Sequence, residues 1–328
     1  RDEAFLREQL KTNDSIAISV ALWAQGFRDI DTATGSMREL IDHGTKNQRL
    51  TASFYTHLLY DDRFKSRIAK DVILGYDGDL ELAACFMGAL TCTLSGDIDR
   101  LFEKREGVRY GYYEIRKPVT PRLENFYEGR QEAEALYDNL GKILAQLPKK
   151  GVTYDPCIFP WYQVSLAPSQ VICQMALTAY VLQDEEKITW CGERLKDVTT
   201  DGYGAYRSRL INLLLYEPSN ARQREILIGY VGNAEEMTSN KAFQLVKRLK
   251  LEDGDFALIE DMLRFKRSTL RKQLIDLLMT REDEGLKASL GRLLADKKEE
   301  KRTAALDMLL QIRKDSGRKE LAVSLAGL

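Results

Sequence analysis

Leu210-Ile211-Asn212-Leu213-Leu214 is the first of four related pentads that decide the fold of this 328-residue chain. Each pentad is an apolar run with one polar residue in its middle. The other three are Ala242-Phe243-Gln244-Leu245-Val246, Leu274-Ile275-Asp276-Leu277-Leu278 and Ala305-Leu306-Asp307-Met308-Leu309, so the starts lie 32, 32 and 31 residues apart. A fixed period of about 20–50 residues is typical of stacked repeats. Because one unit cannot bury its apolar face alone, neighbouring units share a continuous core.

The first 100 residues also predict a series of amphipathic helices. Polar residues that favour helix starts precede the apolar runs, at Asn13/Asp14, Ser36, Asp62 and Asp79. A weaker period of about 31 residues aligns Leu50-Thr51-Ala52, Tyr55 and Leu59 with Glu81-Leu82-Ala83, Phe86 and Leu90. We therefore expect an N-terminal helical array over residues 1–100.

The middle of the chain interrupts this rhythm. Six of the seven prolines fall between Pro118 and Pro168, and proline is incompatible with helix interiors. One long helix is predicted over 128–147, and a second, almost wholly apolar helix over 171–182. We expect an irregular, proline- and aromatic-rich segment over 101–170, followed by C-terminal repeats over 171–328. The predicted class is all-α.

Charged residues recur at fixed distances before the pentads. Asp201 precedes Arg207 by six residues, and Asp296 precedes Arg302 by six. With the pentads, these pairs resemble the HEAT-repeat family, an α-solenoid of antiparallel helix pairs. The resemblance implies that the two Asp/Arg pairs form a hydrogen-bonded ladder between adjacent units. The chain also resembles, more faintly, the helical-repeat region of long bacterial proteins grouped with a molybdate-metabolism regulator.

Composition favours a globular, cytoplasmic protein. The formal net charge is −1, which gives no global attraction to nucleic acid or membranes. No apolar stretch is long enough to span a bilayer, so no membrane partner is expected. The five cysteines lack a CxxC pair and lie mostly in apolar runs, which predicts buried free thiols in a reducing compartment. The chain begins without Met and stops within an apolar pattern, and we expect it to be part of a longer protein.

The sequence offers no catalytic residues, cofactor or metal site that we can name. His43 and His57 are the only histidines, and neither lies in a metal-ligand spacing with the cysteines. Nucleotide-binding glycine motifs and a GxSxG nucleophile motif are absent from the sequence. An enzyme is therefore the weakest of three hypotheses.

Two segments could bind a partner. The first is a basic turn between repeat helices, residues 264–272, which carries Arg264, Lys266, Arg267, Arg271 and Lys272. These cations could contact phosphates, or they could be a solvated turn in which Arg271 serves the ladder. The second interleaves aromatic and cationic side chains, as Arg109, Tyr110, Tyr112, Tyr113 and Arg116. It could stack on bases or form a protein-binding patch, or its rings could fill a gap between two helical halves.

The leading hypothesis is a non-catalytic scaffold whose concave face binds another protein, or another domain of its own longer chain. The alternative is a nucleic-acid-binding repeat that uses the basic turn. Salt-dependent binding to nucleic acid would distinguish the second from the first.

Overall fold

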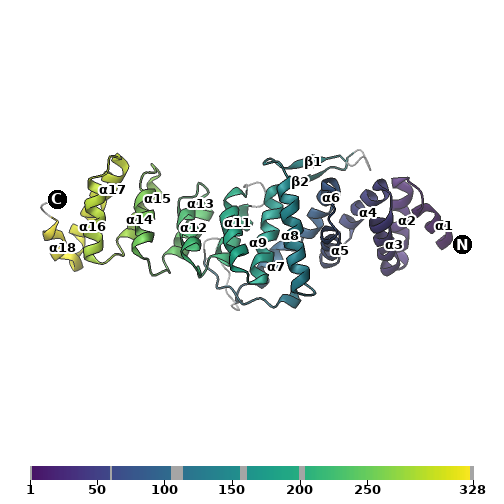
Figure 1. Cartoon of the computed structure of the whole chain (residues 1–328), viewed down its shortest axis with the longest axis horizontal. Helices are drawn as coiled ribbons and strands as arrows, with labels where there is room; N and C mark the ends of the chain where they lie inside the picture. Colours follow the sequence, from purple (N-terminus) through teal and green to yellow (C-terminus); the bar gives the residue numbers. More distant parts are fainter. Residues whose placement is uncertain (1, 60, 105–113, 156–160, 199–203, 326–328) are drawn as a thin grey trace. The chain divides into compact units, whose positions relative to one another are not determined.

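The protein is all-α, as the sequence predicts. A computed structural model of the chain describes residues 2–59, 61–104, 114–155, 161–198 and 204–325 (Figure 1). Within these ranges it contains eighteen α-helices and a single two-stranded sheet. No helix in the described residues combines the length and apolar character needed to cross a membrane.

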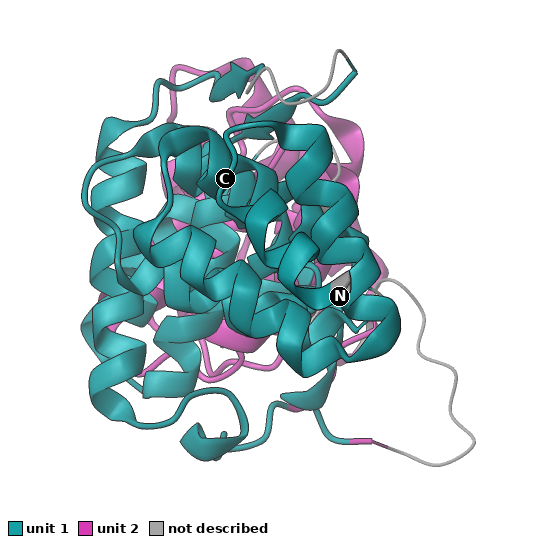
Figure 2. Ribbon diagram, turned by 90° about the vertical axis from the view of Figure 1, so that its right-hand side faces the viewer, with its two compact units in different colours: residues 1–103, 118–210 teal, residues 104–117, 211–328 magenta. Residues whose placement is uncertain are grey.

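The chain divides into two compact units, coloured separately in Figure 2. Unit 1 comprises residues 1–103 and 118–210, and unit 2 comprises residues 104–117 and 211–328. The segment predicted as an irregular centre, 101–170, therefore contributes to both. The α11 helix (Gly204–Leu214) carries the first pentad and crosses the boundary between the units.

Unit 1 is a succession of helices that pack on their neighbours in sequence. They are α1 (Asp2–Leu10), α2 (Ser15–Arg28), α3 (Ile30–His43), α4 (Lys46–Leu58), α5 (Asp62–Leu74), α6 (Leu80–Thr91), α7 (Leu94–Arg100), α8 (Arg130–Gln146), α9 (Pro168–Leu182) and α10 (Glu185–Arg194). Short 3₁₀ turns lie at Leu123–Asn125 and Leu195–Asp197. The α2 helix contacts α1, α3 and α4, and α9 contacts both α8 and α10.

Helix caps confirm part of the predicted boundaries and correct another part. Asp14 accepts hydrogen bonds from the amides of Ile16 and Ala17, and Asp79 caps α6 by accepting from the amide of Leu82. The start predicted at Ser36 is wrong, because α3 begins at Ile30. Asp29 caps α3 by accepting from two first-turn amides, which makes a helix start possible only one residue after α2 ends.

The proline-rich region folds into both extended and helical structure. Strand β1 (Val152–Tyr154) pairs antiparallel with β2 (Val164–Leu166), with Thr153 opposite Ser165. The helix predicted over 171–182 begins earlier, because Pro168 occupies the first turn of α9, where it interrupts no hydrogen bond.

Unit 2 contains the remaining pentads on alternate helices. Its helices after α11 are α12 (Ala221–Val231), α13 (Glu236–Val246), α14 (Asp253–Met262), α15 (Ser268–Leu278), α16 (Asp283–Leu294), α17 (Glu299–Lys314) and α18 (Lys319–Ser324), with a 3₁₀ turn at Ser316–Arg318. The pentads lie on α13, α15 and α17. The 31–32-residue period therefore corresponds to one helix pair.

Burial of the pentads agrees with a shared core. The four apolar positions of the pentad at 274–278 are each no more than 2% exposed, whereas Asp276 is exposed. The last pentad differs, because Leu306 is 55% exposed. Its apolar stripe is covered on one side only.

Side-chain contacts join residues about one period apart. In unit 1, Thr45 Oγ1 donates to Asn13 Oδ1 at 2.7 Å, across 32 positions, and Arg38 binds Asp71 at 2.7 Å, across 33. In unit 2, Arg292 binds Glu260 across 32 positions. Equivalent positions of successive helix pairs are therefore neighbours in space at both ends of the chain.

Candidate binding surfaces

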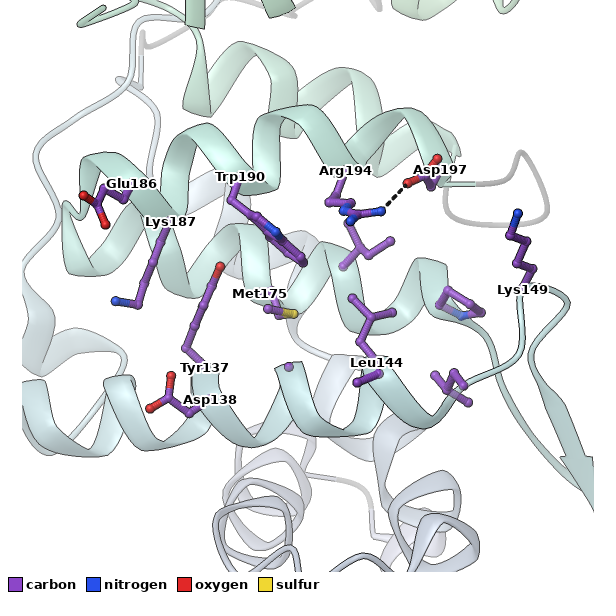
Figure 3. Close-up of a pocket in the computed structure, with 15 residues that line it drawn as sticks. Tyr137, Asp138, Leu144, Lys149, Met175, Glu186, Lys187, Trp190, Arg194 and Asp197 are labelled. Carbon is purple, nitrogen blue, oxygen red and sulfur yellow. Dashed lines mark ion pairs between the residues drawn. The ribbon is translucent and has the colours of Figure 1, made fainter. Parts of the chain in front are cut away.

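A groove in unit 1 lies along α9, between α8 and α10 (Figure 3). The α9 helix contacts both flanking helices, so it forms the floor of the groove. The groove has a volume of about 980 Å³, which is the size of a site for a ligand or for several side chains of a partner. The sequence predicts two of its three helices, over 128–147 and 171–182, but neither α10 nor the groove itself.

Apolar side chains line the middle of the groove. Met175 lies on the floor, Leu144 on the α8 wall and Trp190 on the α10 wall (Figure 3). Trp190 is 36% exposed. Gly141 on α8 lacks a side chain, and a Cβ built there would lie 3.8 Å from the Met175 methyl group. Met175 is itself buried, at 2% exposed, and the glycine leaves the space above it open.

The two ends of the groove carry different charges. Asp138 and Glu186 lie at one end, and Lys149 lies at the other (Figure 3). Arg194 lies on the same side of Trp190 as Lys149, and it pairs with Asp197 at 3.6 Å. Each end is mixed, but acids are prominent at the first and cations at the second.

Local contacts hold the α10 wall in place. Asp184 caps α10 by accepting from the Lys187 amide, and its carboxylate binds Lys187 Nζ at 2.7 Å. The Lys187 side chain and then its amide lower the pKa of Asp184. Lys187 Nζ also lies 5.4 Å from the centre of the Tyr137 ring, which connects α10 to α8. Burial raises the pKa of the Tyr137 phenol, which stays neutral.

The basic turn at 264–272 is largely engaged within unit 2. Arg264 pairs with Asp261, with its Nη1 2.5 Å from the carboxylate, and Lys266 lies 3.6 Å from Glu300. These partners reduce the positive charge that the turn presents to solvent.

Two further cations of this turn connect helix pairs. The guanidinium of Arg267 donates to the carbonyl of Asn233 in the preceding turn, at 2.7 Å. Arg271 lies 3.5 Å from Asp307 on α17. Lys272 is exposed. The placement of Arg267 and Arg271 favours the structural interpretation of the turn, in which its cations hold adjacent pairs in register.

The aromatic segment is described only at its C-terminal end. Arg109, Tyr110, Tyr112 and Tyr113 lie outside the described residues. The backbone of Arg116 is held by Asn212, which accepts from the Arg116 amide at 3.0 Å and donates to its carbonyl at 2.8 Å. Lys241 Nζ donates to the carbonyl of Glu114. The C-terminal end of this segment is therefore fixed to the pentad helices α11 and α13.

The predicted Asp/Arg ladder takes another form. Asp201 lies outside the described residues, and Arg207, 5% exposed, donates to the carbonyl of Val198 at 2.6 Å. Arg302 donates to the carbonyls of Asp296 and Lys297, both at 2.9 Å. The prediction that the pair 296/302 bridges units is wrong, because these bonds remain within one helix pair. Each arginine ties its helix to the turn before it, since turn carbonyls are unpaired acceptors.

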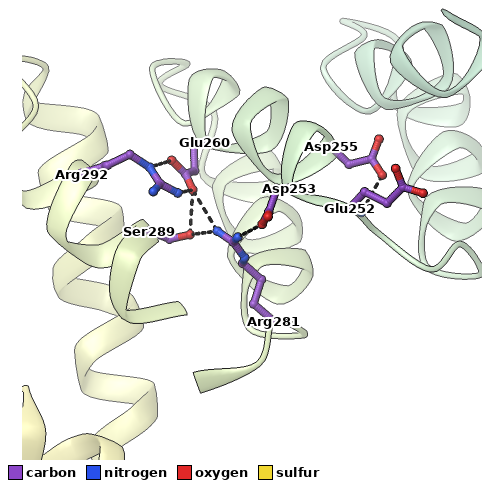
Figure 4. A network of polar contacts seen from close by, with 7 residues as sticks. All are labelled: Glu252, Asp253, Asp255, Glu260, Arg281, Ser289 and Arg292. Atoms are coloured by element: carbon purple, nitrogen blue, oxygen red, sulfur yellow. Dashed lines mark hydrogen bonds and ion pairs between the residues drawn. The ribbon is translucent and has the colours of Figure 1, made fainter. Parts of the chain in front are cut away.

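A cluster of polar side chains in unit 2 connects adjacent helix pairs, which is the role that the predicted Asp/Arg ladder was expected to have (Figure 4). Glu260 on α14 accepts from Ser289 Oγ at 2.7 Å and from Arg292 Nη2 at 2.7 Å, both on α16. Arg281 Nη1 donates to Ser289 Oγ at 2.7 Å and lies 3.6 Å from Glu260. The Arg281 guanidinium stacks on the Phe256 ring, 4.5 Å from its centre. These contacts join α14 to α16.

Groups that could perform chemistry are buried or scattered. Burial raises the pKa of Cys85 to about 12 and that of Cys92 to about 11, so both thiols are protonated and weakly nucleophilic at neutral pH. Burial lowers the pKa of His57, whose Nε2 lies 2.7 Å from the Cys85 carbonyl oxygen. In the described part of the chain, no cluster of three or more His, Cys, Asp and Glu side chains could hold a metal ion.

Comparison with known proteins identifies a family for the chain but no activity. No protein with curated annotation matches it significantly in sequence. A family model matches almost the whole length, residues 1–326, and its description is "Family of unknown function (DUF5724)". The chain therefore belongs to the DUF5724 family.

Proposed function

We propose that this chain is a non-catalytic, HEAT-like helical-repeat scaffold of the cytoplasm, which binds another protein or an adjoining domain. The observation that carries the proposal is the groove between α8 and α10, which offers an apolar middle and charged ends on three packed helices. Helical frames of this kind position a binding surface without contributing chemistry.

The repeat interpretation is supported by the contacts one period apart. Arg224 on α12 binds Asp255 on α14 across 31 positions, and Gln273 on α15 donates to Asn240 on α13 across 33. Bonds at the spacing of the sequence repeat are expected when successive helix pairs stack in the same manner.

The chemistry of the groove fits an amphipathic helix of the partner. Trp190 and Leu144, with the buried Met175 beneath them, would contact apolar residues spaced by three or four positions, which is the pattern of helix-in-groove recognition. The different charges at the two ends would orient that helix. Basic residues would face Asp138 and Glu186, and acidic residues would face Lys149.

Site-specific photo-crosslinking in the native cell tests this proposal. A photoreactive amino acid replaces Trp190, and in a control variant it replaces Trp161, which is 68% exposed and is not among the groove residues. We expect a defined protein adduct from position 190 but not from position 161. Adding Gly141→Phe should abolish the adduct, because the ring fills the groove; the contact of a Cβ at this site with Met175 is an ordinary one. Equal adducts at both positions, or an adduct that survives Gly141→Phe, would refute the proposal.

The nucleic-acid hypothesis has weaker support. Arg264, Lys266, Arg267 and Arg271 all have acidic or carbonyl partners within unit 2. Fluorescence anisotropy with labelled single- and double-stranded oligonucleotides tests the hypothesis directly. Affinity that falls steeply with salt, and that Lys266→Ala with Lys272→Ala weakens, would support it over protein binding.

A further inference from the structure

The α2 helix carries an exposed apolar face. Ile16, Val20, Trp23 and Phe27 are 64%, 55%, 57% and 76% exposed, and Ile30 at the start of α3 is 48% exposed. The rings of Trp23 and Phe27 contact each other edge to face, with centroids 4.6 Å apart. We call these five residues the α2 seam. Exposed apolar side chains gathered on one helix face mark an interaction site more reliably than isolated ones.

Residues one period later lie at a buried interface between helix pairs. The positions 32 residues after the first four seam residues are Gln48, Ala52, Tyr55 and Leu59, and none of them is more than 9% exposed. Gln48 Nε2 donates to the carbonyls of Leu10 and Thr12 at the end of α1, at 3.1 and 2.8 Å. The Tyr55 hydroxyl packs against Gly26 of α2, where a Cβ would lie only 2.5 Å away.

The same positions are buried again in α6. In the 31-residue alignment, Ala52, Tyr55 and Leu59 correspond to Ala83, Phe86 and Leu90, which are 2%, 0% and 3% exposed. This helix face is therefore where a preceding helix pair packs in the repeat. On α2 the equivalent face is exposed, and by this equivalence it is suited to pack against another helix.

The spacing and the sizes of the seam residues indicate which helix it receives. Within α2, the intervals of four, three and four residues from Ile16 to Phe27 are those of a coiled-coil seam, which packs against a single facing helix. On α2 itself, the N-terminal half of the seam (Ile16 and Val20) is aliphatic and the C-terminal half (Trp23 and Phe27) is aromatic. A second α2 that lies antiparallel would place Phe27 opposite Ile16 and Trp23 opposite Val20, so each large side chain would meet a smaller one.

Charge complementarity favours the same partner. Asp14 caps the start of α2, and Arg28 is in its last turn. In the antiparallel arrangement, Arg28 of each copy would approach Asp14 of the other, whereas a parallel arrangement would bring like charges together. We propose that the α2 seam binds a second copy of this chain and forms a two-fold symmetric, antiparallel α2–α2 interface. Such an interface uses the same patch on both copies.

Sedimentation velocity of the purified chain over a range of concentrations tests the proposal. We expect a reversible monomer–dimer equilibrium, and Trp23→Asp should raise the dimer dissociation constant by at least about 30-fold, as for a central interface residue. Circular dichroism checks that the variant remains folded, which is expected because residue 23 is exposed. The matched control is Leu306→Asp with Leu310→Asp, since both leucines are 55% exposed on α17. The control should leave the dissociation constant unchanged.

Cysteine cross-linking tests the antiparallel geometry. Variants Val20→Cys and Trp23→Cys are mixed and oxidised, and the disulfides are identified by peptide mass spectrometry. We expect the mixed 20–23 disulfide to dominate, because the two positions face each other across the two-fold axis. A chain that is monomeric at 100 µM, a dimer that Trp23→Asp leaves intact, or a predominance of 20–20 disulfides would each overturn the proposal.

Discussion

Removal of the Glu260 carboxylate tests whether adjacent helix pairs of unit 2 are held together by buried polar contacts. Glu260 and Arg281 have side chains that are 9% and 8% exposed, so neither charge is solvated by water. In Glu260→Ala, Arg281 would retain Asp253, which is 91% exposed and therefore a weak partner. Arg292, 55% exposed, would return to solvent at little cost.

The expected loss follows from these exposures. Breaking a buried ion pair by removing one partner costs about 3–5 kcal/mol. Because Arg292 is solvated and Asp253 remains, we expect about 3 kcal/mol for Glu260→Ala. Glu260→Gln keeps the acceptor oxygen for Ser289 and Arg292 but loses the charge, so about 1–2 kcal/mol is expected. The double variant Glu260→Met, Arg281→Met removes both charges and should lie close to the wild type in stability.

Urea unfolding followed by circular dichroism measures these differences. With a slope of about 1–3 kcal/mol per molar urea, the midpoint of Glu260→Ala should fall by about 1 M or more. Hydrogen exchange should show the loss of protection in α14 and α16 first, since the network joins these helices. If Glu260→Ala shifts the midpoint no more than Glu260→Gln, or if the double variant is as unstable as the single one, the network does not couple the two pairs.

Three further predictions concern other parts of the chain. Leu277→Asp places a charge at a position that is 1% exposed, in a core shared by neighbouring pairs, and hydrogen exchange should show unfolding of more than its own pair; loss of protection confined to α15 would contradict a shared core. The Lys187 hydrogen bonds lower the pKa of Asp184 from 3.8, so their stabilisation is present above this value and is lost as pH falls through the lower folded pKa. Asp184→Asn should flatten the acid limb of a thermal-stability profile, and an unchanged limb would exclude this carboxylate as a contributor. Iodoacetamide at pH 8 should label Cys85 far more slowly in the native protein than in urea, because its thiol pKa is about 12 and its side chain is buried; equal rates by peptide mass spectrometry would contradict its placement.

Much of the helical framework could be predicted because it depends on local chemistry. Asp14 and Asp79 mark helix starts because their carboxylates accept amide protons two or three residues away. The start of α3 was missed because the single residue Asp29 is both the C-cap of α2 and the N-cap of α3. No stretch of several polar residues therefore separates the two helices in the sequence. The β1–β2 hairpin was missed because two three-residue strands are too short for alternation to be recognised.

The groove could not be predicted from the sequence, although two of its three helices, α8 and α9, could. Trp190 lies in a charged helix and gives no sign that its ring faces Leu144, which is 46 positions earlier in the sequence. Only the packing of both α8 and α10 on α9 brings these residues to one surface. Gly141 gave a weak signal, since glycine inside a helix is costly and often has a packing or functional reason.

The pentads show how the two kinds of information divide. The sequence by itself determined which helix faces are apolar and how often they recur, because stacked pairs repeat the same contacts at every period. It did not determine what happens to the polar residue in the middle. Gln244 and Asp276 are exposed, whereas Asn212 at the same pentad position is buried and binds the backbone of Arg116, 96 residues away. Periodicity encodes contacts between neighbours in the repeat, but a contact with a segment outside the repeat is decided only when the tertiary structure brings the two together.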